Sequence, residues 1–201
     1  EPRRAAPHIV LFLADDLGWG DVGFHGSRIS TPHIDAIARS GVRLEQFYVQ
    51  PVCSPTRGAF LTGRYPMRLG LQVGVVRPWA EHGLPLGERT LAEALRDAGY
   101  ATAICAKWHL GHGFRDYLPT RRGFDRQYGL YNGAIDYFTH KPGVGEAVLG
   151  GGVGEGEGGA HERSSSAMAT CSATALGKAA SSMSKSPSPR SVAQVWCSTA
   201  P

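Results

Sequence analysis

The sequence has little cysteine, a single asparagine and no long apolar run. Four cysteines in 201 residues are too few for a scaffold held together by disulfides. The apolar run at residues 9–14 has the length of a strand, and no stretch is long enough to form a transmembrane segment. The formal net charge of +4 comes from scattered basic residues, so we expect no nucleic acid partner and only a weak preference for anions.

The C-terminal part of the sequence lacks the composition of a folded domain. Residues 141–201 contain no Asp, no Asn and one aromatic residue, Trp196, and they are rich in Gly and Ser. Such a segment buries too little apolar surface to offset the entropy of ordering it. We therefore predict a folded part over residues 7–140 and a low-complexity, disordered tail over residues 141–201. Residue 1 is Glu, and no signal peptide is present after it.

The folded part alternates between apolar runs and helix signals. Residues 8–14 are mostly apolar, which is typical of a parallel strand covered on both faces. Thr31 precedes a Pro, and Thr90 begins a capping box, so both are predicted to start helices. The other predictions are strands at 42–50 and 100–105, helices at 31–41, 56–62 and 90–98, and turns with a short helix at 118–136. This order predicts an α/β fold.

Two adjacent carboxylates, Asp15 and Asp16, follow the first predicted strand. Open α/β sheets bind their ligands at the carboxyl ends of strands. Neighbouring carboxylates repel each other, and a hard cation such as Ca²⁺ or Mg²⁺ relieves that repulsion. The pair indicates a metal site, and a solvated strand end is the alternative.

A second candidate site is Cys53-Ser-Pro-Thr-Arg57, which is followed by Leu61-Thr-Gly-Arg64. A helix that begins near Cys53 offers free backbone N–H groups, and Arg57 adds a guanidinium at the same place, which together favour an anion. A cysteine in such surroundings is a candidate nucleophile. A buried or disulfide-bonded cysteine in a turn is the alternative.

A third candidate site is Lys107-Trp-His109, at the end of the predicted strand at 100–105. Residues two apart on a strand project to the same side, so Lys107 and His109 can reach one anionic group. Lysine supplies charge, and histidine transfers protons near neutral pH. A solvated Lys with a half-buried His is the alternative for this pair alone, but three such groups at strand ends point to one site.

These motifs, in this order and spacing, resemble those of the sulfatase family. The resemblance covers roughly residues 7–140. Within the family, the sequence looks most like the arylsulfatase B group, which includes N-acetylgalactosamine-4-sulfatases. The segments that carry it are Pro7-His-Ile-Val-Leu-Phe-Leu-Ala-Asp-Asp-Leu-Gly-Trp-Gly-Asp21, Gly23-Phe-His-Gly-Ser-Arg28, Thr31-Pro-His-Ile-Asp35, Cys53–Arg57, Leu61–Arg64, Gly70-Leu-Gln, Lys107-Trp-His-Leu-Gly111 and Leu118-Pro-Thr-Arg-Arg-Gly-Phe-Asp125.

The resemblance implies the N-terminal half of an alkaline-phosphatase-like α/β fold, with a mixed, mostly parallel sheet flanked by helices. It also implies a sulfuric ester hydrolase of the arylsulfatase type. In that family a maturation enzyme, the formylglycine-generating enzyme or an equivalent, oxidises the motif cysteine to formylglycine. One hydroxyl of the formylglycine hydrate attacks sulfur, and the second then loses its proton and expels sulfate. The implied substrate is a sulfated small molecule or glycan.

Roles carry over to matching positions of this sequence. Cys53 is the implied precursor of the nucleophile, and Arg57 would hold the formylglycine. Lys107 would contact the nucleophile and the sulfate, and His109 would act as the base in sulfate release. Ala106 stands where the family usually has Gly, so its Cβ is expected to crowd the turn if positive φ is needed.

The resemblance implies Ca²⁺ bound by Asp15, Asp16 and the modified Cys53. It also implies a later Asp-Asn pair, a second His and a second Lys. Asn132 is the only asparagine, and no Asp follows Asp136, so that pair is absent from the sequence. The remaining His and Lys candidates, in the predicted tail, are His161, Lys178 and Lys185. We hypothesise a truncated or frameshifted gene product.

Two alternatives remain open. The chain is either a hydrolase or a catalytically dead fragment, a pseudoenzyme with residual metal or anion binding. Within the same superfamily, hydrolysis of phosphonate monoesters or phosphodiesters is also compatible with the Cys53 motif. By resemblance, the protein would be secreted, periplasmic or lysosomal.

Overall fold

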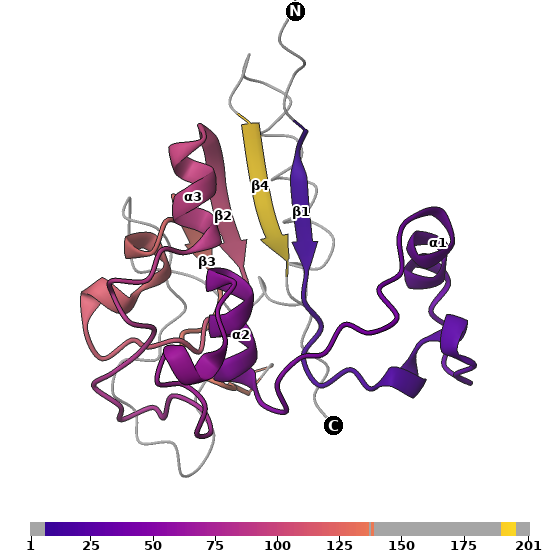
Figure 1. Ribbon diagram of the computed structural model, residues 1–201, viewed down its shortest axis with the longest axis horizontal. Coiled ribbons are helices and arrows are strands. Elements are labelled where there is room, and N and C mark those ends of the chain that lie inside the picture. The colour runs from indigo at the N-terminus through magenta and orange to yellow at the C-terminus, as the bar shows by residue number, and fades with distance from the viewer. Residues whose placement is uncertain (1–6, 137, 139–189, 196–201) are drawn as a thin grey trace, which may run out of the picture.

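The computed structural model describes residues 7–136, 138 and 190–195. Its four strands form one sheet in the order β1-β4-β2-β3, and every neighbouring pair is parallel. All the strands therefore end at the same edge of the sheet, which is the lower edge in Figure 1. The strands are β1 (Ile9–Phe12), β2 (Tyr100–Cys105), β3 (Arg126–Tyr128) and β4 (Arg190–Val195).

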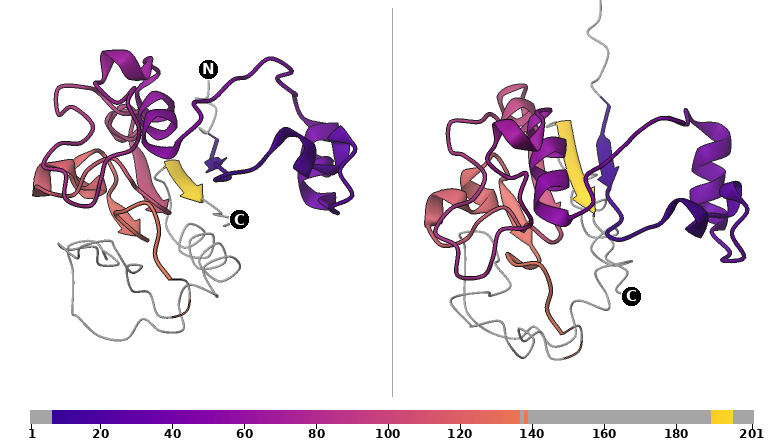
Figure 2. Two further views of the ribbon diagram at one scale, coloured as in Figure 1. Left: turned by 90° about the horizontal axis from the view of Figure 1, so that it is seen from below. Right: turned by 60° about the horizontal axis from the view of Figure 1, so that its bottom comes forward.

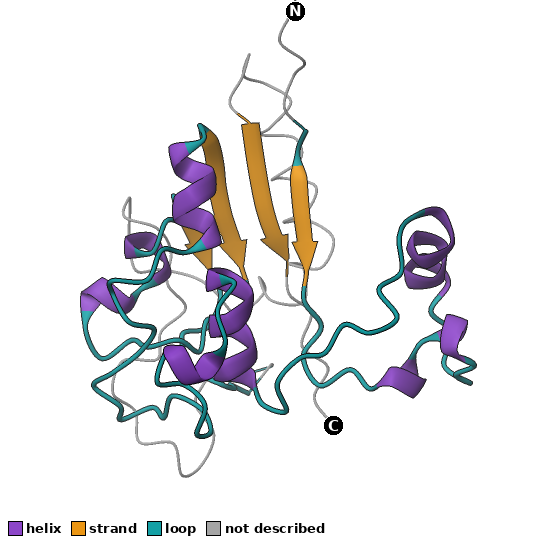
Figure 3. Ribbon diagram, viewed as in Figure 1, coloured by secondary structure: helices purple, strands orange, loops and turns teal. Residues whose placement is uncertain are grey.

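Helices α2 and α3 lie on one face of this sheet, and helix α1 lies apart from it (Figures 1 and 2). Much of the remaining described chain consists of loops and short 3₁₀ turns (Figure 3). The three α-helices are α1 (Pro32–Ser40), α2 (Cys53–Thr62) and α3 (Leu91–Asp97). The 3₁₀ turns are η1 (Trp19–Asp21), η2 (Gly23–His25), η3 (Pro66–Arg68), η4 (Arg115–Tyr117) and η5 (Pro119–Arg121).

Thr31 and Thr90 were both predicted to start helices, and both do, but only Thr90 caps its helix with its side chain. Thr90 and Glu93 form a reciprocal capping box at the start of α3, in which the Thr90 Oγ1 accepts from the Glu93 N–H at 3.1 Å. Thr31 precedes α1 but makes no capping bond. Its hydroxyl instead accepts from the Gly23 N–H and donates to Asp35, which ties η2 to α1.

The core lies between α2, α3 and β2. Leu84, Ile104 and Leu110 are almost fully buried there, and Trp108 packs edge-on against Phe124 with ring centroids 6.3 Å apart. The indole N–H of Trp108 donates to backbone carbonyls on the next loop, so burial of this large ring leaves no polar atom unpaired. We call residues 53–132 the packed region.

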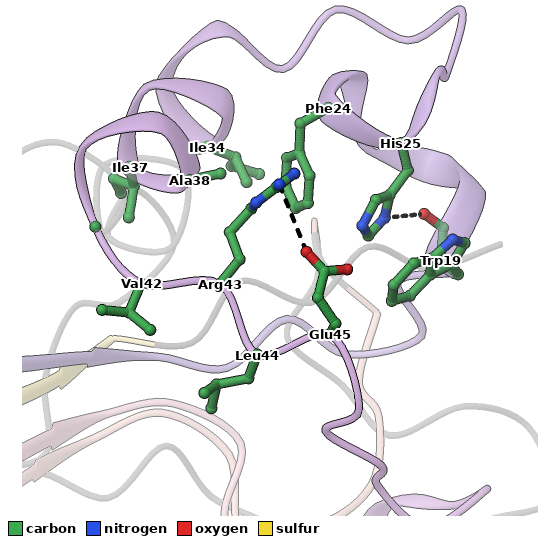
Figure 4. Close-up of a pocket in the computed structure, with 11 residues that line it drawn as sticks. Trp19, Phe24, His25, Ile34, Ile37, Ala38, Val42, Arg43, Leu44 and Glu45 are labelled. Carbon is green, nitrogen blue, oxygen red and sulfur yellow. Dashed lines mark hydrogen bonds and ion pairs between the residues drawn. The ribbon is translucent and has the colours of Figure 1, made fainter.

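Residues 17–52 extend away from the packed region, and we call them the N-terminal arm (Figures 1 and 2). Its own pocket lies between η1, η2, α1 and the chain after α1 (Figure 4). There the Trp19 and His25 rings stack at 3.6 Å, and Arg43 pairs with Glu45 at 3.5 Å. No residue of α1 is buried, so the arm has little core of its own.

Two predictions of local structure are corrected. Residues 42–50 form no strand, because their side chains are exposed and no strand pairs with their backbone in the described part of the chain. The predicted turns at 118–136 include β3, which is only three residues long and pairs with β2 from Ala103 to Cys105. A strand this short leaves no periodic signal in the sequence.

The predicted disorder of residues 141–201 does not hold for Arg190–Val195, which form β4 between β1 and β2. Parallel pairing uses backbone N–H and C=O groups, so a low-complexity sequence can supply a strand. The remaining residues of that range lie outside the described part of the chain. None of the described helices is long and apolar enough to cross a membrane.

Candidate active site

The carboxyl edge of the sheet brings together the three sequence motifs that were singled out. Asp15 follows β1, Lys107 follows β2, and α2 begins at Cys53 beside them. The Lys107 ammonium donates to Asp15 Oδ2 at 2.6 Å and to the Cys53 sulfur at 3.0 Å. Residues separated by 92 positions in the chain therefore meet at one ammonium group.

Arg57 fixes this cluster from inside α2. It lies one helical turn after Cys53, so both side chains lie on the same face of the helix. Its guanidinium donates to Asp15 Oδ1 at 2.8 Å and to the Lys107 carbonyl at 2.9 Å. Only 1% of Arg57 is exposed, so these bonds are made away from water, where they hold their geometry.

The start of α2 adds positive potential at Cys53. Val52 precedes the helix and provides no side-chain cap, so the first backbone N–H groups are not satisfied by a capping side chain. The helix dipole places partial positive charge at this end.

The C-terminal end of α2 is set by Gly63, where φ of 67° places the backbone in the left-handed region that glycine adopts without strain.

Asp15 is held in its charged form. Burial opposes ionisation of this carboxyl group, but the hydrogen bond from Lys107 and the charges of Arg57 and Lys107 outweigh it, so its pKa lies below the ordinary 3.8. Burial lowers the pKa of Arg57 from 12.5, and Asp15 and Cys53 act in the opposite direction. With two cations and one anion, the cluster keeps an excess of one positive charge.

His109 is buried next to the same cations. Burial, followed by the charges of Lys107 and Arg57, lowers the pKa of His109 from 6.5 to about 3. The imidazole is therefore neutral near neutral pH. Its Nε2 lies 3.0 Å from the Val76 carbonyl oxygen, and its backbone φ of 56° is in the left-handed region.

Asp16 is not brought into the cluster. It is exposed, with a positive φ of 56°, whereas both oxygens of Asp15 face Arg57 and Lys107. Carboxylate oxygens suit Ca²⁺, but the described residues contain no group of three or more His, Cys, Asp or Glu that could hold a metal. The described residues therefore do not make a complete calcium site.

The crowding expected at Ala106 does not occur. Positive φ among the non-glycine residues that the structure describes is found at Asp16 and His109, not at Ala106. The Ala106 N–H donates to the Tyr128 carbonyl at 2.8 Å, which continues the β2–β3 pairing. The backbones of Ala106 and Gly129 lie close together, and Gly129 makes this possible because any Cβ there would overlap the Ala106 backbone.

Two residues that support the site, Ser54 and Gly133, were not predicted from the sequence. Ser54 is fully buried, and its hydroxyl joins the His109 carbonyl to the Val76 N–H. Gly133 lies so close to the His109 ring that a Cβ there would overlap it. Ser54 lies inside the Cys53 motif, which could have marked it as a residue of the site. Its hydrogen-bond partners are 22 and 55 residues away, so the local sequence pattern does not reveal them.

Comparison with known proteins decides the family. The sequence model of the family described as Sulfatase matches residues 7–183. The chain belongs to the sulfatase family. It is 48% identical to arylsulfatase J of Mus musculus over 142 residues, which are 69% of this chain and 24% of that protein. It is 48% identical to arylsulfatase A of Homo sapiens over 127 residues, which are 62% of this chain and 25% of that protein.

Solved structures confirm the predicted α/β, alkaline-phosphatase-like fold. A structure of Ps i-CgsB in complex with k-i-k-neocarrahexaose has a TM-score of 0.78 and 28% identity, and the likeness covers 94% of this chain and 44% of that one. The PsFucS1 sulfatase from Pseudoalteromonas sp. has a TM-score of 0.68 and 27% identity, covering 94% and 43%. The chain spans about a quarter of the length of the curated relatives it matches.

Proposed function

We propose that this member of the sulfatase family is a sulfuric ester hydrolase whose nucleophile derives from Cys53. The observation that carries the proposal is the Lys107 ammonium, which lies 3.0 Å from the Cys53 sulfur in a cluster with one excess positive charge. A sulfate monoester carries one negative charge at the group under attack. Such a cluster at a helix N-terminus suits an anion of that charge.

The proposed nucleophile is a formylglycine hydrate made from Cys53 by a maturation enzyme that supplies the oxidant. One hydroxyl of the hydrate loses its proton as its oxygen forms a bond to sulfur, while the bond from sulfur to the substrate oxygen breaks. That substrate oxygen takes up a proton, and the alcohol leaves. The second hydroxyl then loses its proton and becomes the aldehyde oxygen, and the bond from carbon to the sulfate oxygen breaks. Sulfate leaves, and water adds to the aldehyde to restore the hydrate.

Lys107 and Arg57 have the positions to support both steps. Lys107 would donate to the nucleophile oxygen that replaces the Cys53 sulfur, and its charge would stabilise the negative oxygens of the sulfate. Arg57 would keep Asp15 and the Lys107 backbone in place through its two hydrogen bonds. A rigid arrangement of charge needs little reorganisation during reaction.

His109 is the proposed base in sulfate release. Its pKa of about 3 leaves it neutral, so one ring nitrogen has a lone pair available for the proton of the second hydroxyl. Calcium binding by Asp15, Asp16 and the modified Cys53 stays a prediction, because the described residues supply only part of a ligand set.

Two measurements test the proposal on residues 1–201 co-expressed with a formylglycine-generating enzyme. Mass spectrometry of the peptide that spans Cys53 should show the mass of the aldehyde in place of the thiol. Turnover of a chromogenic aryl sulfate in the presence of Ca²⁺ should be lost in Cys53→Ala and kept in Cys105→Ala, a matched change at a second cysteine that is not part of a disulfide. Unmodified Cys53, or turnover that survives Cys53→Ala, would contradict the proposal.

A non-catalytic anion-binding protein is the second candidate. It is favoured by the incomplete metal site of the described residues, together with a cationic cluster that remains intact. Calorimetric binding of inorganic sulfate without turnover of any ester would support it. Faster turnover of a phosphonate or phosphodiester than of the matched sulfate ester would instead assign the chain to that chemistry.

A further inference from the structure

The hydrogen-bond partners of His109 fix which of its ring nitrogens carries the proton. Nε2 lies 3.0 Å from the Val76 carbonyl oxygen, and a carbonyl can only accept, so Nε2 must donate. A neutral imidazole has one N–H, so Nδ1 has none. Nδ1 is buried and has no hydrogen-bond partner among the described residues. The lone pair of Nδ1 therefore accepts no hydrogen bond from the described residues and is available to take up a proton.

The Ser54 hydroxyl holds both ends of this arrangement. It accepts from the Val76 N–H at 3.0 Å, so its own proton goes to the His109 carbonyl oxygen at 2.7 Å. Val76, whose carbonyl accepts from the His109 ring, is thus tied to the His109 backbone through the Ser54 oxygen atom. Because Ser54 follows Cys53 at the start of α2, the same link connects the ring to the nucleophile position.

Gly133 restricts the ring from the side. A Cβ at this position would lie 2.7 Å from Cε1 and 3.0 Å from Nε2 of His109, so the ring packs directly against the glycine backbone. The His109 N–H donates to the Tyr131 carbonyl at 2.9 Å, which anchors the same loop beside it. The ring is thus held by contacts on the loop that contains Gly133 and by the Val76 carbonyl.

We propose that Ser54 is a positioning residue that keeps His109 in the Nε2–H tautomer and makes Nδ1 its proton-accepting atom. The use of that lone pair in sulfate release rests on the proposed function. The tautomer itself is a property of the folded chain. Ser54, one residue after the nucleophile precursor, would thereby set the orientation of nucleophile and base together.

The test is nitrogen NMR of residues 1–201 labelled with ¹⁵N-histidine, in which His109→Gln identifies the His109 signals. The parent chain should show an unprotonated, pyridine-type Nδ1 and a protonated, pyrrole-type Nε2. Ser54→Ala removes one buried hydrogen-bond bridge, so the preference for this tautomer should fall by roughly tenfold and the two signals should move toward each other. Ser54→Thr, which keeps the hydroxyl, should restore the parent pattern.

Ser40→Ala is the matched control, because its hydroxyl also donates to a backbone carbonyl but lies on α1, away from His109. It should leave the His109 signals unchanged. A protonated Nδ1 in the parent chain overturns the proposal, as does a folded Ser54→Ala that keeps the parent pattern. If the Ser54 variants do not fold, the parent spectrum alone decides. Failure of Cys53 oxidation or of ester turnover would overturn the proposed function and leave this measurement unaffected.

Discussion

The packed region and the N-terminal arm bury their apolar residues to very different degrees. Leu84 of the packed region is 0% exposed, whereas Ile37 on α1 of the arm is 65% exposed. In the packed region apolar side chains from α2, α3 and β2 share one core, but α1 has no comparable partner in the described part of the chain. The free energy that stabilises this structure therefore comes chiefly from the packed region.

The candidate site lies where these two regions meet. Cys53, Arg57 and Lys107 belong to the packed region, and Asp15 lies at the start of the chain that leads into the arm. Two ion pairs, at 2.8 Å from Arg57 and 2.6 Å from Lys107, hold Asp15 against the packed region. The site thus depends on the rigid region for its cations and on its attachment to the arm for its anion.

The largest effect is expected when the buried guanidinium is removed. Arg57→Ala leaves the buried Asp15 with one cation and the Lys107 carbonyl without its donor, which should lower the free energy of unfolding by about 3–5 kcal/mol. Arg64→Ala breaks an ion pair with Glu88 in which the Arg64 side chain is 52% exposed, and it should cost less than about 1 kcal/mol. Urea denaturation of both variants measures the difference, and equal losses would contradict it.

Removing a packed side chain is expected to lower the free energy of unfolding slightly less, and only in the packed region. Leu84→Ala removes a fully buried side chain and should cost about 2–5 kcal/mol. Ile37→Ala removes a similar number of atoms from an exposed face and should stay within about 0.5 kcal/mol. The measurement is the midpoint of chemical denaturation for each variant. A large loss in Ile37→Ala would show that the arm has a core that these residues do not reveal.

Acid should weaken the packed region through His109. Its pKa is about 3 in the folded chain and 6.5 as an ordinary value, so between these pH values the unfolded chain binds a proton that the folded chain does not. Stability therefore falls as the pH falls through this window, by up to about 1.4 kcal/mol per pH unit. Denaturation at stepped pH measures the slope. His109→Gln should flatten it, and the matched change His25→Gln in the arm should not.

Calcium should have the smallest effect, because both oxygens of Asp15 already face cations. If the dissociation constant exceeds the calcium concentration used, binding stabilises the fold by less than about 0.4 kcal/mol. Thermal denaturation with calcium and with a chelator measures this. A clear rise in melting temperature that Asp16→Asn abolishes would show that the carboxylate pair binds the ion in the isolated chain.

Much of the candidate site could be predicted because its signals are local. The apolar run before Asp15, the Cys53–Arg57 spacing and the capping box at Thr90 each depend on neighbouring residues. Features that depend on distant partners could not be predicted in this way. Residues 42–50 have the composition of a strand but pair with no strand that the structure describes. β4 has a partner on each side but little sequence signal, and the Ser54 bridge joins loops far apart in the chain.

The contact between Asp15 and Lys107 also bears on the order in which the molecule assembles. It closes a loop of 92 residues, and loops of that length form late because their ends must first be brought together. Cys53 lies inside that loop, so its surroundings are complete only after both ends have met. The rate at which a thiol reagent modifies Cys53 during refolding therefore reports when the site closes.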